Sequence, residues 1–348
     1  MMKKWFGRRV IKTGLAVLIT ASICQLLHLS PTFAVITAIV TTEPTVADSI
    51  RKGVIRLPAA ALGAIFTITA TTVLGQHAIS YALVAMLTII VCSKLQFDTG
   101  TLVATLTAVA MIPDTTNHAL FDFASRVSAT SIGIFVSTLV NFVILPPKFG
   151  PLLVEKVDSL FKRTAKDFYS MLEMHLSNQR EPNQNLSLLS IHEELIKAYQ
   201  LARYQDDESQ YRSSSEYEQR SFDYLHKKLD YLQLSLYHIG KIAYLKVNQP
   251  LTNREIKLIL VVIHSLHLIL HDHYHQITSN HLTSIEQLKA LKITHQSSNS
   301  FIFQLCHELL SLHDVVTELS QLTAEERRIS LQDKKYPEYI FRKQFMYE

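Results

Sequence analysis

The stretch LPAAALGAIFTITATTVLG, residues Leu57–Gly75, decides the fold, because it continues for nineteen residues without a charged side chain. A helix needs about twenty apolar residues to cross the hydrocarbon core of a bilayer. Five further apolar stretches lie in the same half of the chain: Val10–Leu29, Pro31–Val46, Ala78–Cys92, Phe97–Ile112 and Val127–Leu145. We therefore predict an all-α fold in which residues 1–150 form a polytopic membrane bundle of six transmembrane helices.

The cationic side chains predict the orientation of this bundle, since cytoplasmic loops of membrane proteins are rich in Lys and Arg. If the N-terminus with Lys3 and Lys4 lies inside, six crossings also place three other basic connections inside. These contain Arg51-Lys52-Arg56, Lys94 and Pro146-Pro147-Lys148, while Arg126 enters the last span from outside. We predict that both termini face the cytoplasm.

Two of the apolar stretches have alternative interpretations. Val10–Leu29 follows a basic N-terminus and precedes Pro31-Thr32-Phe33-Ala34, so it also resembles a secretory signal with a cleavage site. Its length of about twenty residues favours an uncleaved first span. Pro31–Val46 contains Glu43 and Pro44, which predicts a broken or partly re-entrant helix.

Residues 151–348 have a different composition. They carry twenty-three Lys or Arg and twenty-five Asp or Glu, against eleven and five in residues 1–150. Leu225, Leu229, Leu232 and Leu236 step by four and three, which is typical of an amphipathic helix. We predict a cytoplasmic α-helical domain of four or five helices. No basic stripe with interleaved aromatic residues occurs, which argues against nucleic acid as a partner.

Three charged residues of the membrane half are candidates for ion coupling or ion pairing, because ionisable groups at membrane depth are costly. Lys12 lies one turn after Arg8 and either snorkels to the headgroups or takes part in function. Glu43 stands in a threonine-rich segment, where its carboxylate could pair with Arg51 or Arg56. A structural ion pair and a transport role are both consistent with this position.

Two helices carry stripes of small and polar residues that end in arginine. Such stripes let helices pack closely, or they line a pathway with hydroxyl groups and a cation at its end. Arginines at opposite ends of the two stripes favour an organic anion as substrate. The predicted pathway residues are Arg56 and Thr67 in the third span, and Arg126, Thr130, Ser137 and Asn141 in the last.

The second half also contains histidines at helical spacing. His264, His267 and His271 share one face, a weak candidate for a zinc or nickel site, or the polar face of an amphipathic helix. Without supporting cysteines or glutamates, we predict no metal. The sequence lacks phosphate-binding, dinucleotide-binding, zinc-protease and nucleophile-elbow motifs, so we predict no cofactor and no enzymatic activity.

Four strings carry a resemblance to a known family. They are RVIKTGLA (Arg9–Ala16), AIVTTEPT (Ala38–Thr45), IRKGVIRLPA (Ile50–Ala59) and NFVILPPK (Asn141–Lys148). In this order they resemble the aromatic acid exporter family member 1 group, also known as UPF0421, of Gram-positive bacteria. That group is similar to the wider fusaric acid resistance and aluminium-activated malate transporter superfamily.

The resemblance implies a multi-pass protein of the bacterial plasma membrane that exports aromatic or other organic carboxylate anions. Exporters of the superfamily carry two membrane halves in one chain, whereas this chain has one, so the resemblance also implies a homodimer. It assigns no residue roles. Two alternatives stay open: an anion channel of malate-channel type gated by the tail, and a membrane-anchored sensing or interaction module.

Overall fold

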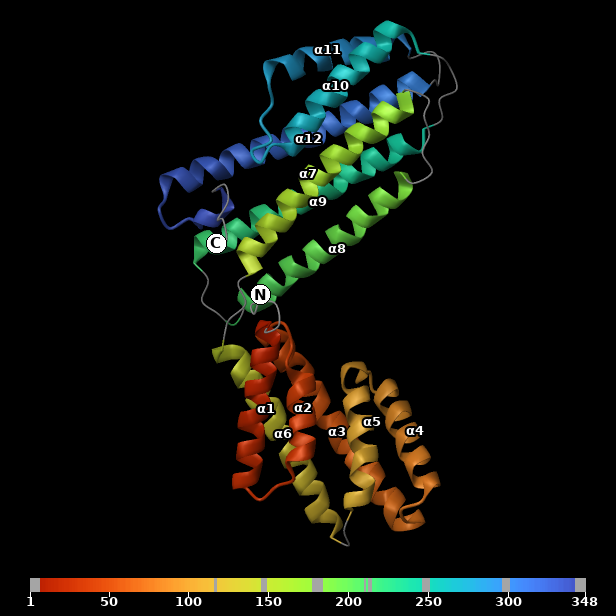
Figure 1. Ribbon diagram of the computed structural model, residues 1–348, viewed down its shortest axis with the longest axis vertical. Coiled ribbons are helices and arrows are strands. Elements are labelled where there is room, and N and C mark those ends of the chain that lie inside the picture. Colours follow the sequence, from red (N-terminus) through yellow and green to blue (C-terminus); the bar gives the residue numbers. More distant parts are fainter. Residues whose placement is uncertain are drawn as a thin grey trace. The chain divides into compact units, whose positions relative to one another are not determined.

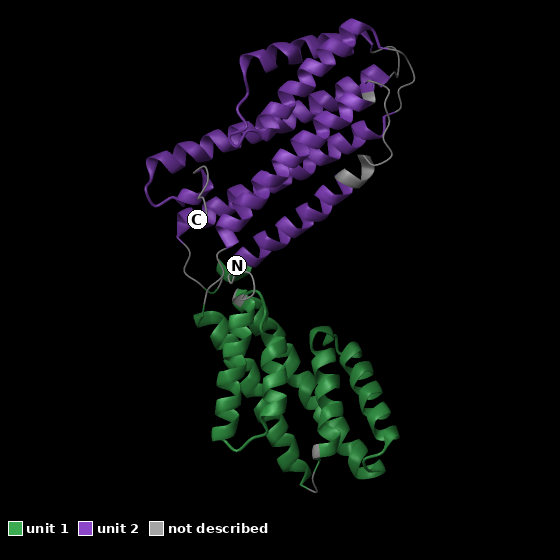
Figure 2. Cartoon of the chain, in the orientation of Figure 1, with its two compact units in different colours: residues 1–147, 207–212 green, residues 148–206, 213–348 purple. Residues whose placement is uncertain are grey.

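The computed structural model describes residues 7–115, 118–144, 149–176, 184–209, 211, 215–245, 251–295 and 301–341, all of them helical or in connections, without a strand. Lys3, Lys4 and the Pro146-Pro147-Lys148 junction lie outside these residues. The chain divides into two compact units (Figure 2). Unit 1 comprises Met1–Pro147 with Asp207–Arg212, and unit 2 comprises Lys148–Asp206 with Ser213–Glu348.

Unit 1 is a bundle of helices joined by short connections (Figure 1). Its elements are α1 (Arg8–Leu26), α2 (Pro31–Thr41), α3 (Val46–Leu74), α4 (Ala78–Lys94), α5 (Asp98–Met111), the 3-10 turn η2 (Ile112–Asp114) and α6 (Ala119–Val143). In the described part of the chain, α1, α3 and α6 are long and apolar enough to cross a membrane, whereas α2 and α4 are shorter apolar helices.

Helix α3 begins earlier than the sequence pattern predicted. The Thr45 hydroxyl accepts a hydrogen bond from the Asp48 N–H at 3.1 Å and caps the helix, and the Asp48 carboxylate lies in its positively polarised first turn. Arg51, Lys52 and Arg56 therefore belong to α3 and not to a connection. The helix ends at Gly75, whose φ of +72° is in the left-handed region that glycine adopts readily.

Helix α2 confirms the prediction of an interrupted second segment. Pro31 stands at its first position, where the missing N–H costs nothing, and the helix ends at Thr41. The next four residues are not helical, because Pro44 cannot continue the hydrogen-bonding pattern. The eleven residues of α2 measure about 16 Å, which is about half the thickness of a bilayer core.

Unit 2 contains six α-helices among the described residues, more than the four or five predicted, since the C-terminal part folds into three. They are α7 (Phe149–Leu176), α8 (Gln184–Ser209), α9 (Glu216–Ala243), α10 (Asn253–His271), α11 (Ser279–Thr294) and α12 (Phe301–Gln332), followed by the 3-10 turn η3 (Glu338–Ile340). Thr252 and Glu255 form a reciprocal capping box at the start of α10.

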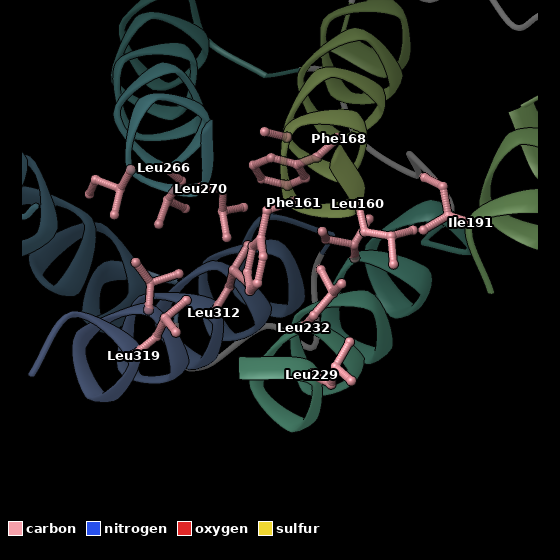
Figure 3. Close-up of a cluster of buried hydrophobic side chains, with 14 of the residues drawn as sticks. Leu160, Phe161, Phe168, Ile191, Leu229, Leu232, Leu266, Leu270, Leu312 and Leu319 are labelled. Carbon is pink, nitrogen blue, oxygen red and sulfur yellow. The ribbon is translucent and has the colours of Figure 1, made fainter. Parts of the chain in front are cut away.

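The core of unit 2 joins α7, α9, α10 and α12 (Figure 3). Phe161 and Phe168 project from α7 towards Leu266 and Leu312, and Leu229 and Leu232 come from α9. The leucine seam predicted on α9 is buried at Leu225, Leu229 and Leu232, and Leu236 is partly buried. Burying a leucine or phenylalanine side chain contributes about 1.5–3 kcal/mol. This apolar core is what makes unit 2 compact.

A pair of buried histidines connects α10, α11 and α12. His281 Nε2 lies 3.0 Å from His313 Nδ1, and His281 Nδ1 lies 2.7 Å from the Ser265 hydroxyl. Burial, with the neighbouring His313, lowers the pKa of His281 to about 4. The pKa of His313 is lowered by burial as well. Folding therefore favours the neutral form of both imidazoles.

This pair predicts acid sensitivity of unit 2. The pKa of His281 in the folded chain lies below its unfolded value of about 6.5, so its stabilising effect is present above about pH 6.5 and is lost as the pH falls towards about 4. We expect the melting temperature of the full chain in detergent to fall between about pH 7 and pH 5, measured by circular dichroism. His281→Gln should flatten this dependence. Replacing the exposed His192 on α8 should not, and equal slopes in both variants would contradict the prediction.

Candidate functional site

Arg126 lies in the second turn of α6 and is buried, with 3% of its surface exposed. No described residue forms a hydrogen bond with its Nε, Nη1 or Nη2 atom. Its guanidinium carbon lies 4.0 Å from the centre of the Phe33 ring of α2, a cation–π contact that compensates part of the cost of burial. Three unpaired donors in an apolar setting are an uncommon feature, since buried polar groups are normally hydrogen-bonded.

A guanidinium in this state is suited to bind a carboxylate. Its planar donors match the two oxygens of a carboxylate, and such a pair is stronger than a neutral hydrogen bond. The aromatic ring beside it supplies an apolar wall. The geometry at Arg126 therefore fits an organic anion.

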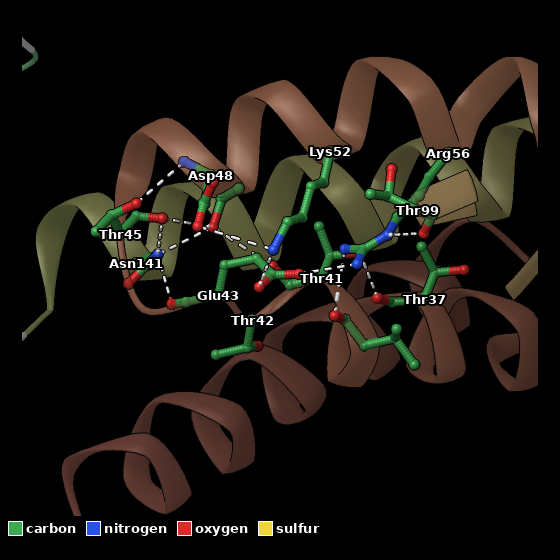
Figure 4. Close-up of polar contacts among 12 residues, drawn as sticks. Thr37, Thr41, Thr42, Glu43, Thr45, Asp48, Lys52, Arg56, Thr99 and Asn141 are labelled. Atoms are coloured by element: carbon green, nitrogen blue, oxygen red, sulfur yellow. Dashed lines mark hydrogen bonds and ion pairs between the residues drawn. The ribbon is translucent and has the colours of Figure 1, made fainter. Parts of the chain in front are cut away.

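A polar network, here called the Glu43 network, surrounds the connection between α2 and α3 (Figure 4). The Glu43 carboxylate lies between two cations of α3, at 2.8 Å from Arg56 Nη2 and 2.9 Å from Lys52 Nζ. Arg56 also donates from Nη1 to the Val40 carbonyl at 3.2 Å and from Nε to the Thr99 carbonyl at 3.3 Å. The guanidinium thus joins α2, α3 and α5.

This arrangement differs from the predicted pairing. Glu43 pairs with Arg56, as one of the two expectations had it, but Arg51 is exposed and its place is taken by Lys52. Lys52 was missed by the sequence analysis. Its spacing of four residues from Arg56 puts both cations on one face of a helix, and this signal could have identified it once α3 was known to begin at Val46.

Asn141, near the end of α6, belongs to the same network. Its amide nitrogen lies within 2.9–3.1 Å of the Glu43 and Thr45 carbonyls and of the Ser49 hydroxyl. Its oxygen accepts a hydrogen bond from Lys12 Nζ of α1 at 2.7 Å. Lys12 is 6% exposed, so its ammonium is turned into the bundle rather than towards headgroups. Asn141 therefore connects α1 and α6 to the break between α2 and α3.

The two predicted stripes are packing faces in this conformation. A Cβ added to Gly133 of α6 would lie 2.4 Å from the Ala34 carbonyl of α2, and one added to Gly63 of α3 would lie 3.0 Å from Ala108 of α5. The stripe hydroxyls are hydrogen-bonded to backbone: Thr67 to Gly63 and Ala108, Thr130 to Arg126 and Ser137 to Ile134. A pathway along these residues stays a prediction, because it requires the faces to separate.

The histidine stripe of α10 packs against α7. His267 Nδ1 lies 2.9 Å from the Ala165 carbonyl, and the rings of His264 and His267 both contact Tyr169. In the part of the chain that the structure describes, no group of three His, Cys, Asp or Glu residues is arranged to hold a metal ion. The contacts of this stripe are those of a packed amphipathic helix.

The chain is similar in sequence to several known proteins. Residues 4–144 match the family described as aromatic acid exporter family member 1. The chain is 50% identical to a UPF0421 protein of Halalkalibacterium halodurans, over 98% of this chain and 96% of the relative. It is 40% identical to a UPF0421 protein of Bacillus cereus, over 92% and 96%. A UPF0421 protein of Staphylococcus saprophyticus is 34% identical, over 90% and 97%.

Proposed function

We propose, from the premise that this chain belongs to the aromatic acid exporter family member 1 family, that it moves organic carboxylate anions out of a bacterial cell. The family is one of exporters rather than enzymes, and three helices are long and apolar enough to span a membrane. The single observation that carries the proposal is Arg126, a buried guanidinium with three unpaired donors beside an aromatic ring. Aromatic carboxylates match both of these groups.

In this proposal, α1–α6 cross the plasma membrane and both chain ends face the cytoplasm. The α2 helix crosses together with the non-helical residues that follow it. The enrichment of Lys and Arg in cytoplasmic segments supports this topology, which would put Arg51, Lys52 and Lys94 on the cytoplasmic side. The second half, residues 151–348, is then a cytoplasmic domain. A homodimer supplies the second membrane half.

The described conformation is a closed one in this proposal. The anion binds at Arg126 and passes along Thr130 and Ser137 of α6 towards Asn141, after the faces packed against α2 have separated. Arg56 and Thr67 of α3 line the opposite wall. The burial of all of these side chains is consistent with a pathway that is shut between transport events.

Flux through proteoliposomes tests the proposal. Vesicles that contain the full chain are loaded with radiolabelled 4-hydroxybenzoate at about pH 7. At this pH the carboxyl group is ionised, and the charged molecule leaks slowly through the bilayer. We expect efflux above that of protein-free vesicles, saturating with concentration and depending on an imposed pH gradient. Efflux equal to that of protein-free vesicles would refute the proposal. Large, non-saturating currents in planar bilayers would replace it with the anion channel.

A further inference from the structure

A groove in unit 2, here called the α12 groove, lies between α12 and the connection that follows α10. Its volume is about 290 Å³, close to the lower end of the range of about 300–1,000 Å³ for small-molecule sites. It contains two arginines and no acidic residue, which favours a small anion as its ligand. The lining residues are Tyr274 and Gln276 of the connection, and Ser320, Thr323, Ala324, Arg327, Arg328 and Leu331 of α12.

The carboxylates on the neighbouring elements are engaged with other partners. Glu325 and Glu326 of α12 both pair with Arg220 of α9, at 3.7 and 3.2 Å. In the connection, the Asp272 carboxylate accepts a hydrogen bond from the Gln276 N–H at 3.1 Å. No described residue forms an ion pair with either guanidinium of the groove. A ligand carboxylate would therefore meet two cations that are not already neutralised.

Arg327 is held in position by an aromatic side chain of the connection. Its guanidinium carbon lies 4.3 Å from the centre of the Tyr274 ring, a cation–π contact. The Tyr274 hydroxyl donates to the Phe341 carbonyl at 3.3 Å, and the two rings stack with their centres 6.4 Å apart. A side chain that is already ordered loses little conformational entropy when it binds a ligand, which favours affinity.

The connection itself is fixed by His275. This residue has a φ of +51°, in the left-handed region that residues with a side chain rarely adopt. Its Nδ1 atom lies 2.9 Å from the Ile269 carbonyl, and its buried ring lies 4.7 Å from the Phe161 ring. Strained residues persist where their surroundings hold them, and they are common at ligand sites. The turn at His275 presents its two neighbours, Tyr274 and Gln276, to the groove.

The apolar part of the lining suits an organic anion better than inorganic phosphate. Leu331 is 78% exposed, and Ala324 lies two turns before it on the same face of α12. An apolar ligand body that covers these side chains removes them from water, a gain that phosphate cannot provide. The planar donors of a guanidinium also match the two oxygens of a carboxylate. These features together fit a small carboxylic acid with an apolar ring.

A larger groove of unit 2, of about 510 Å³ between α7 and α8, provides a comparison. Lys156 and Lys197 line it, but so does Glu155, and Glu194 pairs with Lys156 at 2.8 Å. The two positive and two negative charges cancel. This groove therefore favours an anion less than the α12 groove does.

We infer that the α12 groove is a binding site for small aromatic carboxylates, in which Arg327 and Arg328 bind the carboxylate and Leu331 contacts the ring. The inference rests on the proposed function for the identity of the acid, since the groove then takes the same class of anion as Arg126 in unit 1. The chain accordingly has two anion sites, one in each unit. The site in unit 2 binds without transporting.

Equilibrium dialysis of radiolabelled 4-hydroxybenzoate tests the inference separately from flux. The full chain in nanodiscs carries Arg126→Ala, which removes the proposed transport site and leaves unit 2 unchanged. We expect a single anion to bind to each chain. Adding Arg327→Ala or Arg328→Ala should weaken binding about tenfold, because each change removes a charged donor. Adding Leu331→Asn should weaken it about threefold through the loss of apolar contact.

Matched controls separate this site from a general attraction of anions to the surface. Lys197→Ala removes an exposed cation from the groove between α7 and α8 and should leave binding unchanged. 4-Hydroxybenzyl alcohol keeps the ring but lacks the carboxylate, and it should not compete. Inorganic phosphate keeps the charge but lacks the ring, and it should compete only weakly. If Arg327→Ala fails to fold, Arg328→Ala replaces it, because the Arg328 side chain is exposed.

Three outcomes would overturn the inference. Lys197→Ala weakens binding as much as the arginine variants do, phosphate competes as well as unlabelled 4-hydroxybenzoate, or the Arg126→Ala chain binds no anion. Efflux by the wild type would in each case leave the proposed function standing while the site is rejected. Conversely, binding in the α12 groove by a wild-type chain that shows no efflux would reject the proposed function and retain the site.

Discussion

Replacing Arg126 with alanine is expected to lower the efflux of 4-hydroxybenzoate from proteoliposomes about tenfold to a hundredfold. The guanidinium offers an anion three donor nitrogens that are not hydrogen-bonded to any residue in the described part of the chain. Losing a charged hydrogen-bonding partner costs about 1.5–3 kcal/mol, which corresponds to this range of affinity. Arg126→Lys keeps the charge but loses the planar pair of donors, so we expect it to be intermediate.

The stability of the same variant provides an independent measurement. A buried cation without a hydrogen-bonding partner destabilises the bundle, and the contact with Phe33 offsets only part of this cost, so Arg126→Ala should unfold at the same temperature as the wild type or higher. The exposed Arg9 of α1 is the matched control, and Arg9→Ala should change neither flux nor stability. If Arg126→Ala transported at the wild-type rate, or if it lost flux only because it unfolded, Arg126 would not be the anion site.

The second large effect is expected at Gly133, where a single methyl group should disrupt unit 1. In Gly133→Ala the new Cβ would meet the Ala34 carbonyl at 2.4 Å and the Thr37 side chain at 3.0 Å, both on α2. A backbone atom cannot give way as a flexible side chain can, so the two helices must move apart. Overpacking of this kind costs about 1–3 kcal/mol. Thermal unfolding in detergent micelles should show a clear loss of stability.

Gly14 of α1 is the control for this substitution, because nothing lies within 4 Å of a Cβ added there. Gly14→Ala should be neutral or stabilising, since alanine is the better helix former by up to about 1 kcal/mol. Equal melting temperatures of the two variants would show that α2 and α6 are not in close contact. A stable Gly133→Ala with reduced flux would favour the pathway interpretation of the stripe over the packing one.

Much of the helical pattern could be predicted from sequence because apolar periodicity is a local property. The buried face of α9 and the interruption after Thr41 follow from spacing and from Pro44, and the structure contains both. The start of α3 was missed, because a charged first turn resembles a loop until its cap is recognised. Thr45 and Asp48 supply that cap.

The partners of the site residues were less predictable. A stripe of small residues tells which face of a helix is packed, but not which helix covers it. The α6 stripe meets α2 and the α3 stripe meets α5, and neither partner could be read from the stripes themselves. Whether Lys52 or Arg51 faces Glu43 depends on the rotation of α3 about its own axis, which sequence does not give. The lack of a hydrogen-bond partner for Arg126 could not be predicted from sequence, because it depends on which side chains the neighbouring helices place around it.

The short helix α2 has an electrostatic consequence for the proposed passage of anions. Its first turn contains Phe33, which contacts Arg126, and its last turn contains Val40, whose carbonyl accepts from Arg56. A helix behaves as if it carried about half a positive charge at its N-terminus and half a negative charge at its C-terminus. The potential along α2 therefore favours an anion at the Phe33 end, beside Arg126, over the Val40 end, beside Arg56, and these two contacts are about 10 Å apart along the helix axis. Such a slope makes the two ends unequal, so that a bundle of this kind is expected to rectify, passing anions more readily one way than the other.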